Sequence, residues 1–299
     1  MKAMMQTAGL VTQLEPGLRM ILAPNPSPMT FRGTNTFILG EGDVAVIDPG
    51  PEDPAHLRAI LDALRGERIS HIIVTHAHLD HAPLARTLSH ATGAPVLAHG
   101  DARAGRSPVM ERLSRDHPLS GGEGVDTGFV PDIELPDGAR IAGAGWSLRA
   151  LHTPGHFGNH ICLVWHDRIF TGDHVMGWAS TMVSPPDGDM GAYMRSLERL
   201  TGIPSRRMYP GHGEPIEDPA SRLAELIAHR RAREQAILDA LARGPATARE
   251  LTMRIYTDTP AALLPAAERN VLAHLIDLNE RSRIRAVDPV SPAARFQIV

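Results

Sequence analysis

The sequence predicts an α/β fold followed by a small appended domain. Short apolar runs alternate with segments whose apolar residues recur at helical spacing, which is typical of a sheet covered by helices. Histidine and aspartate residues follow several of the expected strands, so loops beyond the strands are expected to build a site. With 299 residues and 42% hydrophobic content, the chain can form one large domain and one small one.

The first part of the chain is expected to alternate strands and helices. Strands are predicted at residues 18–23, 34–39, 43–48, 70–75 and 95–99, separated by turn-forming residues. A helix is predicted over residues 54–64 and ends at Gly66. Another is predicted over residues 81–91, with Pro83 in its first turn. Residues 100–136 show no sustained period and are predicted to form an irregular loop on the substrate side.

Four side chains of metal-ligand type follow the strand that begins at residue 70: His76, His78, Asp80 and His81. Packing them for stability alone is costly, because each imidazole nitrogen needs a partner and the carboxylate needs a cation. His76 and His78 alternate by two and can converge on one point, whereas Asp80 and His81 lie on the next turn. The spacing favours two neighbouring metal positions over a solvated histidine-rich loop.

Three further candidates lie on glycine-containing turns after later strands. A strand at residues 146–151 precedes the turn that carries His156, and a hairpin over residues 161–173 ends in Asp173 behind a glycine. A short strand then precedes His212. The glycine before Asp173 leaves room for two cations to approach its carboxylate, as a carboxylate shared by both would need.

The ordered motifs resemble those of the metallo-β-lactamase superfamily, over roughly residues 15–215. The resemblance implies an αβ/βα sandwich with a two-metal site at one edge. It also implies that one metal is held by His76, His78 and His156, the other by Asp80, His81 and His212, and that Asp173 bridges them. One departure is residues 82–84, Ala-Pro-Leu, where family members commonly have glycines.

Nitrogen and carboxylate ligands without thiolate suit zinc, iron or manganese, and the resemblance favours two zinc ions. Two such cations lower the pKa of a bridging water toward about 7. The chain is therefore predicted to be a dinuclear metal-dependent hydrolase that uses a metal-bridging hydroxide, in which Asp80 also passes the proton to the leaving group. Tyr193 is expected either to donate to the substrate oxyanion, as in related lactonases, or to pack. Asp48 is expected either to hydrogen bond to a metal-binding histidine or to cap a turn.

The tail resembles the winged-helix domain of the β-lactamase-like-protein-2 branch of the superfamily. Helices are predicted over residues 218–242, 248–256 and 265–281, followed by hairpin strands at 283–287 and 294–299. We therefore divide the chain into a catalytic domain, 1–215, and a helical linker with a winged-helix-like domain, 216–299. The latter range holds 12 Lys and Arg against 11 Asp and Glu, so DNA binding is not expected. A packing role or a wall of the substrate pocket is favoured.

The favoured substrate is a small carbonyl compound, a thioester or a lactone. The first alternative is a metal-dependent single-strand endoribonuclease, for which Arg103, Arg106, Arg112 and Arg115 would supply contacts to RNA. The second is a nucleic-acid-binding regulator with a structural metal site. The net charge of -4 gives no indication of nucleic-acid binding, and a homo-oligomer is compatible with the sequence.

Composition also bears on the compartment. Cys162 is the single cysteine, so no intrachain disulfide can form and a reducing compartment is expected. The sequence has no apolar leader and no apolar run of about eighteen residues, so we expect a soluble cytoplasmic protein that does not bind membranes.

Overall fold

The computed structural model describes residues 7–116 and 124–299 and contains two sheets packed face to face. The first sheet has strands in chain order: β1 (Val11–Glu15), β2 (Leu18–Leu22), β3 (Asn35–Glu41), β4 (Asp43–Ile47), β5 (Arg68–Ile73), β6 (Val96–Ala98) and β7 (Ile133–Glu134). Strands β1 to β4 pair antiparallel, and β4 to β7 pair parallel. The parallel part results from helical crossovers, as the alternating pattern predicts.

The second sheet runs in the order β12-β11-β10-β9-β8. Its strands are β8 (Arg140–Gly143), β9 (Trp146–His152), β10 (Ile161–Trp165), β11 (Arg168–Gly172) and β12 (Arg207–Pro210). All pairs are antiparallel except β11 with β12, which are parallel because a helix connects them.

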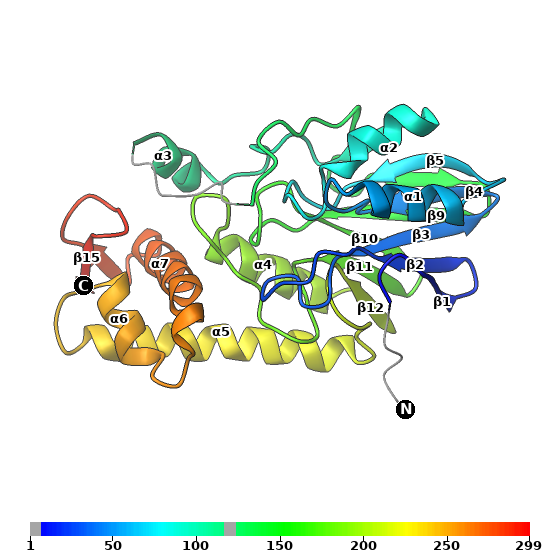
Figure 1. The fold of residues 1–299 in the computed structure, drawn as a ribbon. Coiled ribbons are helices and arrows are strands. Elements are labelled where there is room, and N and C mark those ends of the chain that lie inside the picture. Colours follow the sequence, from blue (N-terminus) through cyan, green and yellow to red (C-terminus); the bar gives the residue numbers. More distant parts are fainter. Residues whose placement is uncertain (1–6, 117–123) are drawn as a thin grey trace.

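Alternation of side chains along β3 separates two cores. Phe37 and Leu39 face the other sheet and pack with residues such as Phe170, whereas Ile38 faces outward. Helices α1 (Pro54–Ala63) and α2 (Leu84–Thr92) cover the outer face of the first sheet. Helices α4 (Met190–Thr201) and α5 (Pro219–Leu241) cover the second sheet (Figure 1). This layer order is the predicted αβ/βα sandwich.

The C-terminal segment forms its own helical core beside the sandwich. It contains β13 (Ala246–Thr247), α6 (Ala248–Ile255), the short 3-10 helix η1 (Ala261–Leu263), α7 (Leu264–Glu280), β14 (Ile284–Ala286) and β15 (Arg295–Ile298). Thr247 caps α6 in a reciprocal capping box with Glu250. Strands β14 and β15 form the predicted wing, to which β13 adds a third strand that was not predicted. The segment lies at the end of the molecule away from β1 and β2 (Figure 1).

Two local predictions were wrong. Residues 100–136 include β7 and a helix, α3 (Pro108–Asp116), although the part at 117–123 lies outside the described residues. Met110 and Leu113 of α3 pack in the C-terminal core, so a helix of nine residues depends on a partner distant in sequence. The helix expected from residue 81 begins at Leu84, because the preceding turn, in which the His81 N–H donates to the His78 carbonyl, directs His81 to the site.

The predicted boundary between residues 215 and 216 stays a prediction. Helix α5 belongs to both parts of the structure, since Leu226 packs on the sandwich and Ile237 in the C-terminal core. No described helix combines the length and the apolar character that a bilayer crossing requires.

Candidate metal centre

The candidate ligands come from loops that leave the strands at one edge of the sandwich. His76, His78, Asp80 and His81 follow β5, His156 follows β9, Asp173 follows β11 and His212 follows β12. The structure brings all seven predicted residues together in two groups whose ligand atoms lie within 4.8 Å of one another. One group is His76, His78, His156 and Asp173, and the other is Asp80, His81, Asp173 and His212.

In the first group, three imidazole nitrogens point at one another. Nδ1 of His78 lies 2.9 Å from Nε2 of His76 and 3.1 Å from Nε2 of His156. Nε2 of His156 is 3.8 Å from Oδ2 of Asp173. These separations bracket the roughly 3.3 to 3.4 Å expected between ligands placed tetrahedrally about 2.0 to 2.1 Å from one cation.

The second group has the same spacing. Nε2 of His212 lies 3.3 Å from Nε2 of His81, 3.1 Å from Oδ2 of Asp80 and 3.3 Å from Oδ2 of Asp173. Oδ1 of Asp173 lies 3.4 Å from Nε2 of His81, and it is buried without a hydrogen-bond partner among the described residues. A buried carboxylate needs a positively charged partner, which a metal ion would supply here, and the nitrogen and oxygen donors of each group fit a metal.

A buried aspartate holds two of these histidines in place. Asp48, which is 1% exposed, accepts hydrogen bonds from the Thr75 N–H at 2.7 Å and from the Thr75 hydroxyl at 2.8 Å. Nδ1 of His81 lies 2.9 Å from Asp48 Oδ2, and Nδ1 of His76 lies 3.0 Å from the Thr75 hydroxyl. Both imidazoles therefore direct Nε2 at the site, and of the two roles expected for Asp48 the structure has the hydrogen bond to a histidine.

Backbone carbonyls orient the other two histidines that direct Nε2 at the site, His156 and His212. Nδ1 of His156 donates to the Met182 carbonyl at 2.8 Å, and Nδ1 of His212 donates to the Gly33 carbonyl at 3.1 Å. These two carbonyls could not be predicted from the sequence, because a backbone acceptor carries no residue signature. The glycine before His212 is needed for space: a Cβ on Gly211 would lie 2.5 Å from Asp173 Oδ1.

Burial and charge set opposite protonation states in the two groups. Burial holds the pKa of His76 well below its ordinary value and lowers the pKa of His78 to about 3, so these rings are neutral and their lone pairs are available. Burial also opposes a charge on His212, but the carboxylates of Asp173 and Asp80 outweigh it and raise the pKa of His212 to about 9. A cation in the second group would replace that proton.

Asp80 and Tyr193 occupy very different positions. The Asp80 side chain is 25% exposed, whereas that of Asp173 is 9% exposed, so Asp80 is the more accessible carboxylate. Tyr193 is fully buried, and its hydroxyl donates to the His174 carbonyl at 3.1 Å. The structure therefore favours packing over oxyanion binding for Tyr193.

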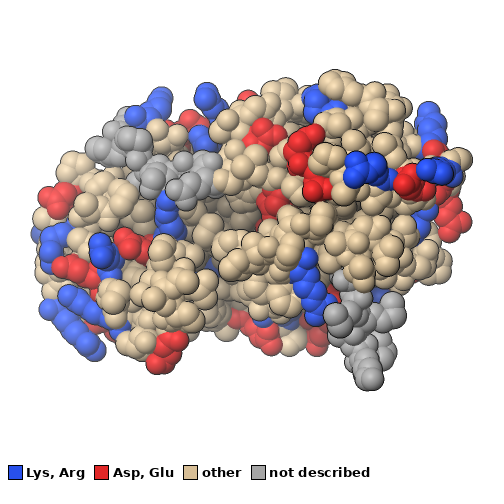
Figure 2. All heavy atoms as spheres, in the orientation of Figure 1, with Lys and Arg blue, Asp and Glu red and all other residues tan. Residues whose placement is uncertain are grey.

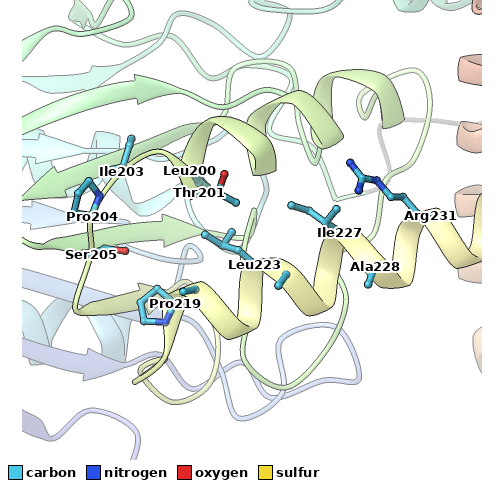
Figure 3. A pocket seen from close by; sticks show the side chains of 12 residues that line it. Leu200, Thr201, Ile203, Pro204, Ser205, Pro219, Leu223, Ile227, Ala228 and Arg231 are labelled. Atoms are coloured by element: carbon cyan, nitrogen blue, oxygen red, sulfur yellow. The ribbon is translucent and has the colours of Figure 1, made fainter.

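Two hollows lie near the C-terminal helices. One, of about 480 Å³, is lined by Phe31, Trp178 and Ile216 among others and adjoins the turn that carries His212. The other, of about 620 Å³, lies between α4 and α5, with Leu223 and Ile227 in its wall (Figure 3). None of the seven candidate ligands lines the second hollow, so it is not the metal centre.

Family models match two parts of the chain. Residues 29–212 match the model of the metallo-beta-lactamase superfamily, and residues 247–289 match that of the beta-lactamase associated winged helix domain. The chain belongs to the metallo-beta-lactamase superfamily. It is a metal-dependent hydrolase of that superfamily and carries the winged-helix domain that was predicted from the sequence of its tail.

The chain is similar to known proteins over most of its length. The chain is 33% identical to the beta-lactamase-like protein 2 homolog of Drosophila melanogaster, over 92% of each chain. It is 31% identical to the lactamase-like protein vrtG of Penicillium aethiopicum, over 86% of this chain and 79% of that one. A metallo-beta-lactamase family protein from Thermus thermophilus is 28% identical and superposes with a TM-score of 0.76, covering 96% of this chain and 100% of that chain.

Proposed function

We propose that the protein hydrolyses a small carbonyl substrate, a thioester or a lactone, with two divalent metal ions. The histidine and carboxylate donors suit zinc, iron or manganese, and the family favours zinc. Two such cations lower the pKa of a water toward about 7 and polarise a carbonyl oxygen. Asp80 is the accessible carboxylate beside them, and its neighbours His81 and His212 hold its pKa well below the usual range against the effect of burial. It is therefore ionised and can accept the proton of the attacking water and pass it to the leaving group.

The observation that supports a carbonyl substrate is an apolar rim beside the second ligand group. Phe31 and Trp178 stack at a centroid distance of 4.9 Å and are 39% and 37% exposed. Trp178 lies over Gly213, since a Cβ there would be 2.7 Å from its ring. Leu79, between two candidate ligands, is 48% exposed. Exposed aromatic and aliphatic groups around a polar centre suit an apolar acyl group.

The charges nearby support a phosphodiester substrate less well. Arg106 pairs with Asp187 at 2.5 Å, and Arg112 lies 3.4 Å from Glu280, so two of the four arginines considered for RNA have acidic partners. Arg32, which lies over the Phe31 ring, pairs with Glu214 at 2.6 Å. On the face shown in Figure 2, basic and acidic side chains are interspersed. A single-strand ribonuclease usually needs a clear basic track along its groove.

The test compares substrates on metal-quantified protein. Acyl thioesters, lactones and single-stranded RNA are assayed with the wild type, with Asp80→Ala and with Asp62→Ala, a control at an exposed aspartate that pairs with Arg65. We expect thioester or lactone turnover that falls at least about 100-fold in Asp80→Ala and is unchanged in the control. RNA cleavage that falls steeply with salt, without turnover of either carbonyl substrate, would establish the ribonuclease alternative instead.

A further inference from the structure

A connection without helix or strand carries part of the metal centre. Between β11 and α4, residues 173–189 include Asp173 and the Met182 carbonyl that orients His156. The Thr181 hydroxyl donates to the Asp173 carbonyl at 2.5 Å. Because this connection has no ladder of its own, its geometry depends on contacts from elsewhere.

Those contacts come from the C-terminal helices. From α5, Arg222 donates to the carbonyls of Met176 and Ala179, at 2.8 Å each. One face of α5 thus runs along the connection, and Arg230, two turns further on, donates to the Thr181 carbonyl. Helix α5, which links the sandwich to the C-terminal segment, therefore supplies hydrogen-bond donors to the backbone of this connection.

Arg230 is buried in an unusual way. It is 2% exposed, its guanidinium lies 5.3 Å from the Tyr193 ring centroid, and Nη1 donates to Asn270 Oδ1 at 3.1 Å. Its contacts with the described residues are to Asn270, the Thr181 carbonyl and the Tyr193 ring, none of which is a carboxylate. A buried guanidinium without a carboxylate is costly, so its retention needs a specific use of its hydrogen bonds.

Asn270 completes a clamp on three residues. Its Oδ1 accepts from Arg230 and also from the Val183 N–H, at 3.1 Å each, while its Nδ2 donates to the Ala266 carbonyl of its own helix. Arg230 and Asn270 thus hold the Thr181 carbonyl and the Val183 N–H, on either side of Met182. The Met182 carbonyl between them is the acceptor for His156.

We propose that Arg230 and Asn270 are positioning residues for the metal ligand His156. By fixing the peptides on both sides of Met182, they hold its carbonyl where it keeps the His156 proton on Nδ1 and directs Nε2 at the first ligand group. Helices α5 and α7 thereby set the metal affinity of the site without touching the metal or the substrate. This role rests on the metal centre of the proposed function and is independent of the substrate.

The test measures the two metal affinities of purified protein. Zn²⁺ binding is titrated against a chromophoric chelator, and Co²⁺ absorption reports the ligand geometry. His156→Ala identifies which equivalent belongs to the first group. We expect Asn270→Leu, which has a similar volume but no acceptor, to weaken that equivalent about 10- to 100-fold and to leave the other unchanged. Asn270→Asp, which keeps the acceptor, should restore binding.

Arg231→Met is a surface control on α5, because Arg231 follows Arg230 directly and pairs with Glu198 at 3.1 Å without contacting the connection. It should bind both equivalents like the wild type. Wild-type binding of both equivalents by Asn270→Leu, or equal weakening of both with a lowered Tm, would overturn the proposal. If Asn270→Leu does not fold, Asn270→Ser, whose hydroxyl is too short to reach both donors, is measured against the same outcomes. A wild type that binds no metal would instead refute the proposed function.

Discussion

Asp48 offers the sharpest test of how the protein prepares its ligands. Its Oδ2 lies 2.9 Å from His81 Nδ1 and accepts from the Thr75 hydroxyl at 2.8 Å. In Asp48→Asn the amide NH₂ replaces either Oδ2, where it faces His81 and the Thr75 hydroxyl, or Oδ1, where it meets the Thr75 N–H, a second donor. The first orientation is favoured, because His81 and the hydroxyl can become acceptors and the N–H cannot. An NH₂ beside His81 favours the tautomer with its proton on Nε2, the atom that a metal needs. We expect the second ligand group to bind metal about 10- to 100-fold more weakly, or about 1.4 to 2.7 kcal/mol.

The change to asparagine should leave the fold nearly intact. Residue 48 has a φ of 51°, in the left-handed region that asparagine tolerates well. Asp48→Ala, in contrast, strains the backbone at this positive φ and leaves three buried donors without an acceptor. It should therefore destabilise the protein by about 3 to 5 kcal/mol. Chelator competition and urea unfolding separate the two effects. Wild-type affinity for both equivalents in Asp48→Asn would refute the reasoning.

Other contacts in the structure give four further predictions. Glu15→Gln removes the buried partner of Arg168 and Tyr209 and should cost about 2 kcal/mol near pH 7 in urea unfolding. Burial opposes ionisation of Glu15, but its hydrogen-bonded partners lower its pKa to about 2. The stabilisation that Glu15 provides should therefore be present above pH 4.5 and lost as the pH falls toward 2. Equal stability of both proteins at pH 7 would contradict this prediction. Trp178→Ala should raise KM about 10-fold for long acyl substrates and little for acetyl ones, and an equal change for both would argue against an acyl-binding rim. Metal binding below pH 9 should release the proton of His212, so the calorimetric binding enthalpy should depend on the ionisation enthalpy of the buffer. This buffer dependence should decline as the pH rises through about 9. A binding enthalpy that is the same in all buffers would exclude the proton release. Deleting residues 216–299 would expose Met110 of α3 and should cause aggregation, whereas a soluble and fully active truncation would contradict that dependence.

Residues whose side chains carry the chemistry could be predicted from the sequence. His76, His78 and Asp80 follow a strand at a spacing that has few structural explanations, and His156 and His212 lie on turns bounded by glycine. Their meeting at one edge follows from the sandwich, because the loops after β5, β9, β11 and β12 leave at that edge. The types of the ligand residues and the predicted strand order therefore both predicted the position of the metal centre.

Residues that act through the backbone could not be predicted in this way. In the sequence, Arg230 and Asn270 cannot be told from other polar residues of a helix. Their partners are a backbone carbonyl and a backbone N–H, which every type of residue except proline has and which therefore give no sequence signal. Helix α3 was missed for a related reason, since Met110 and Leu113 gain their meaning only from the C-terminal core. The sequence also left Tyr193 open, because a tyrosine after a helix start is compatible with either burial or a site.

The most direct measurement of the central claim is the metal content of the purified protein together with anomalous scattering from its crystals. We predict two metal ions per chain, one among His76, His78 and His156 and one among Asp80, His81 and His212, with Asp173 contacting both. Metal-replete protein without anomalous density at these positions would contradict the account.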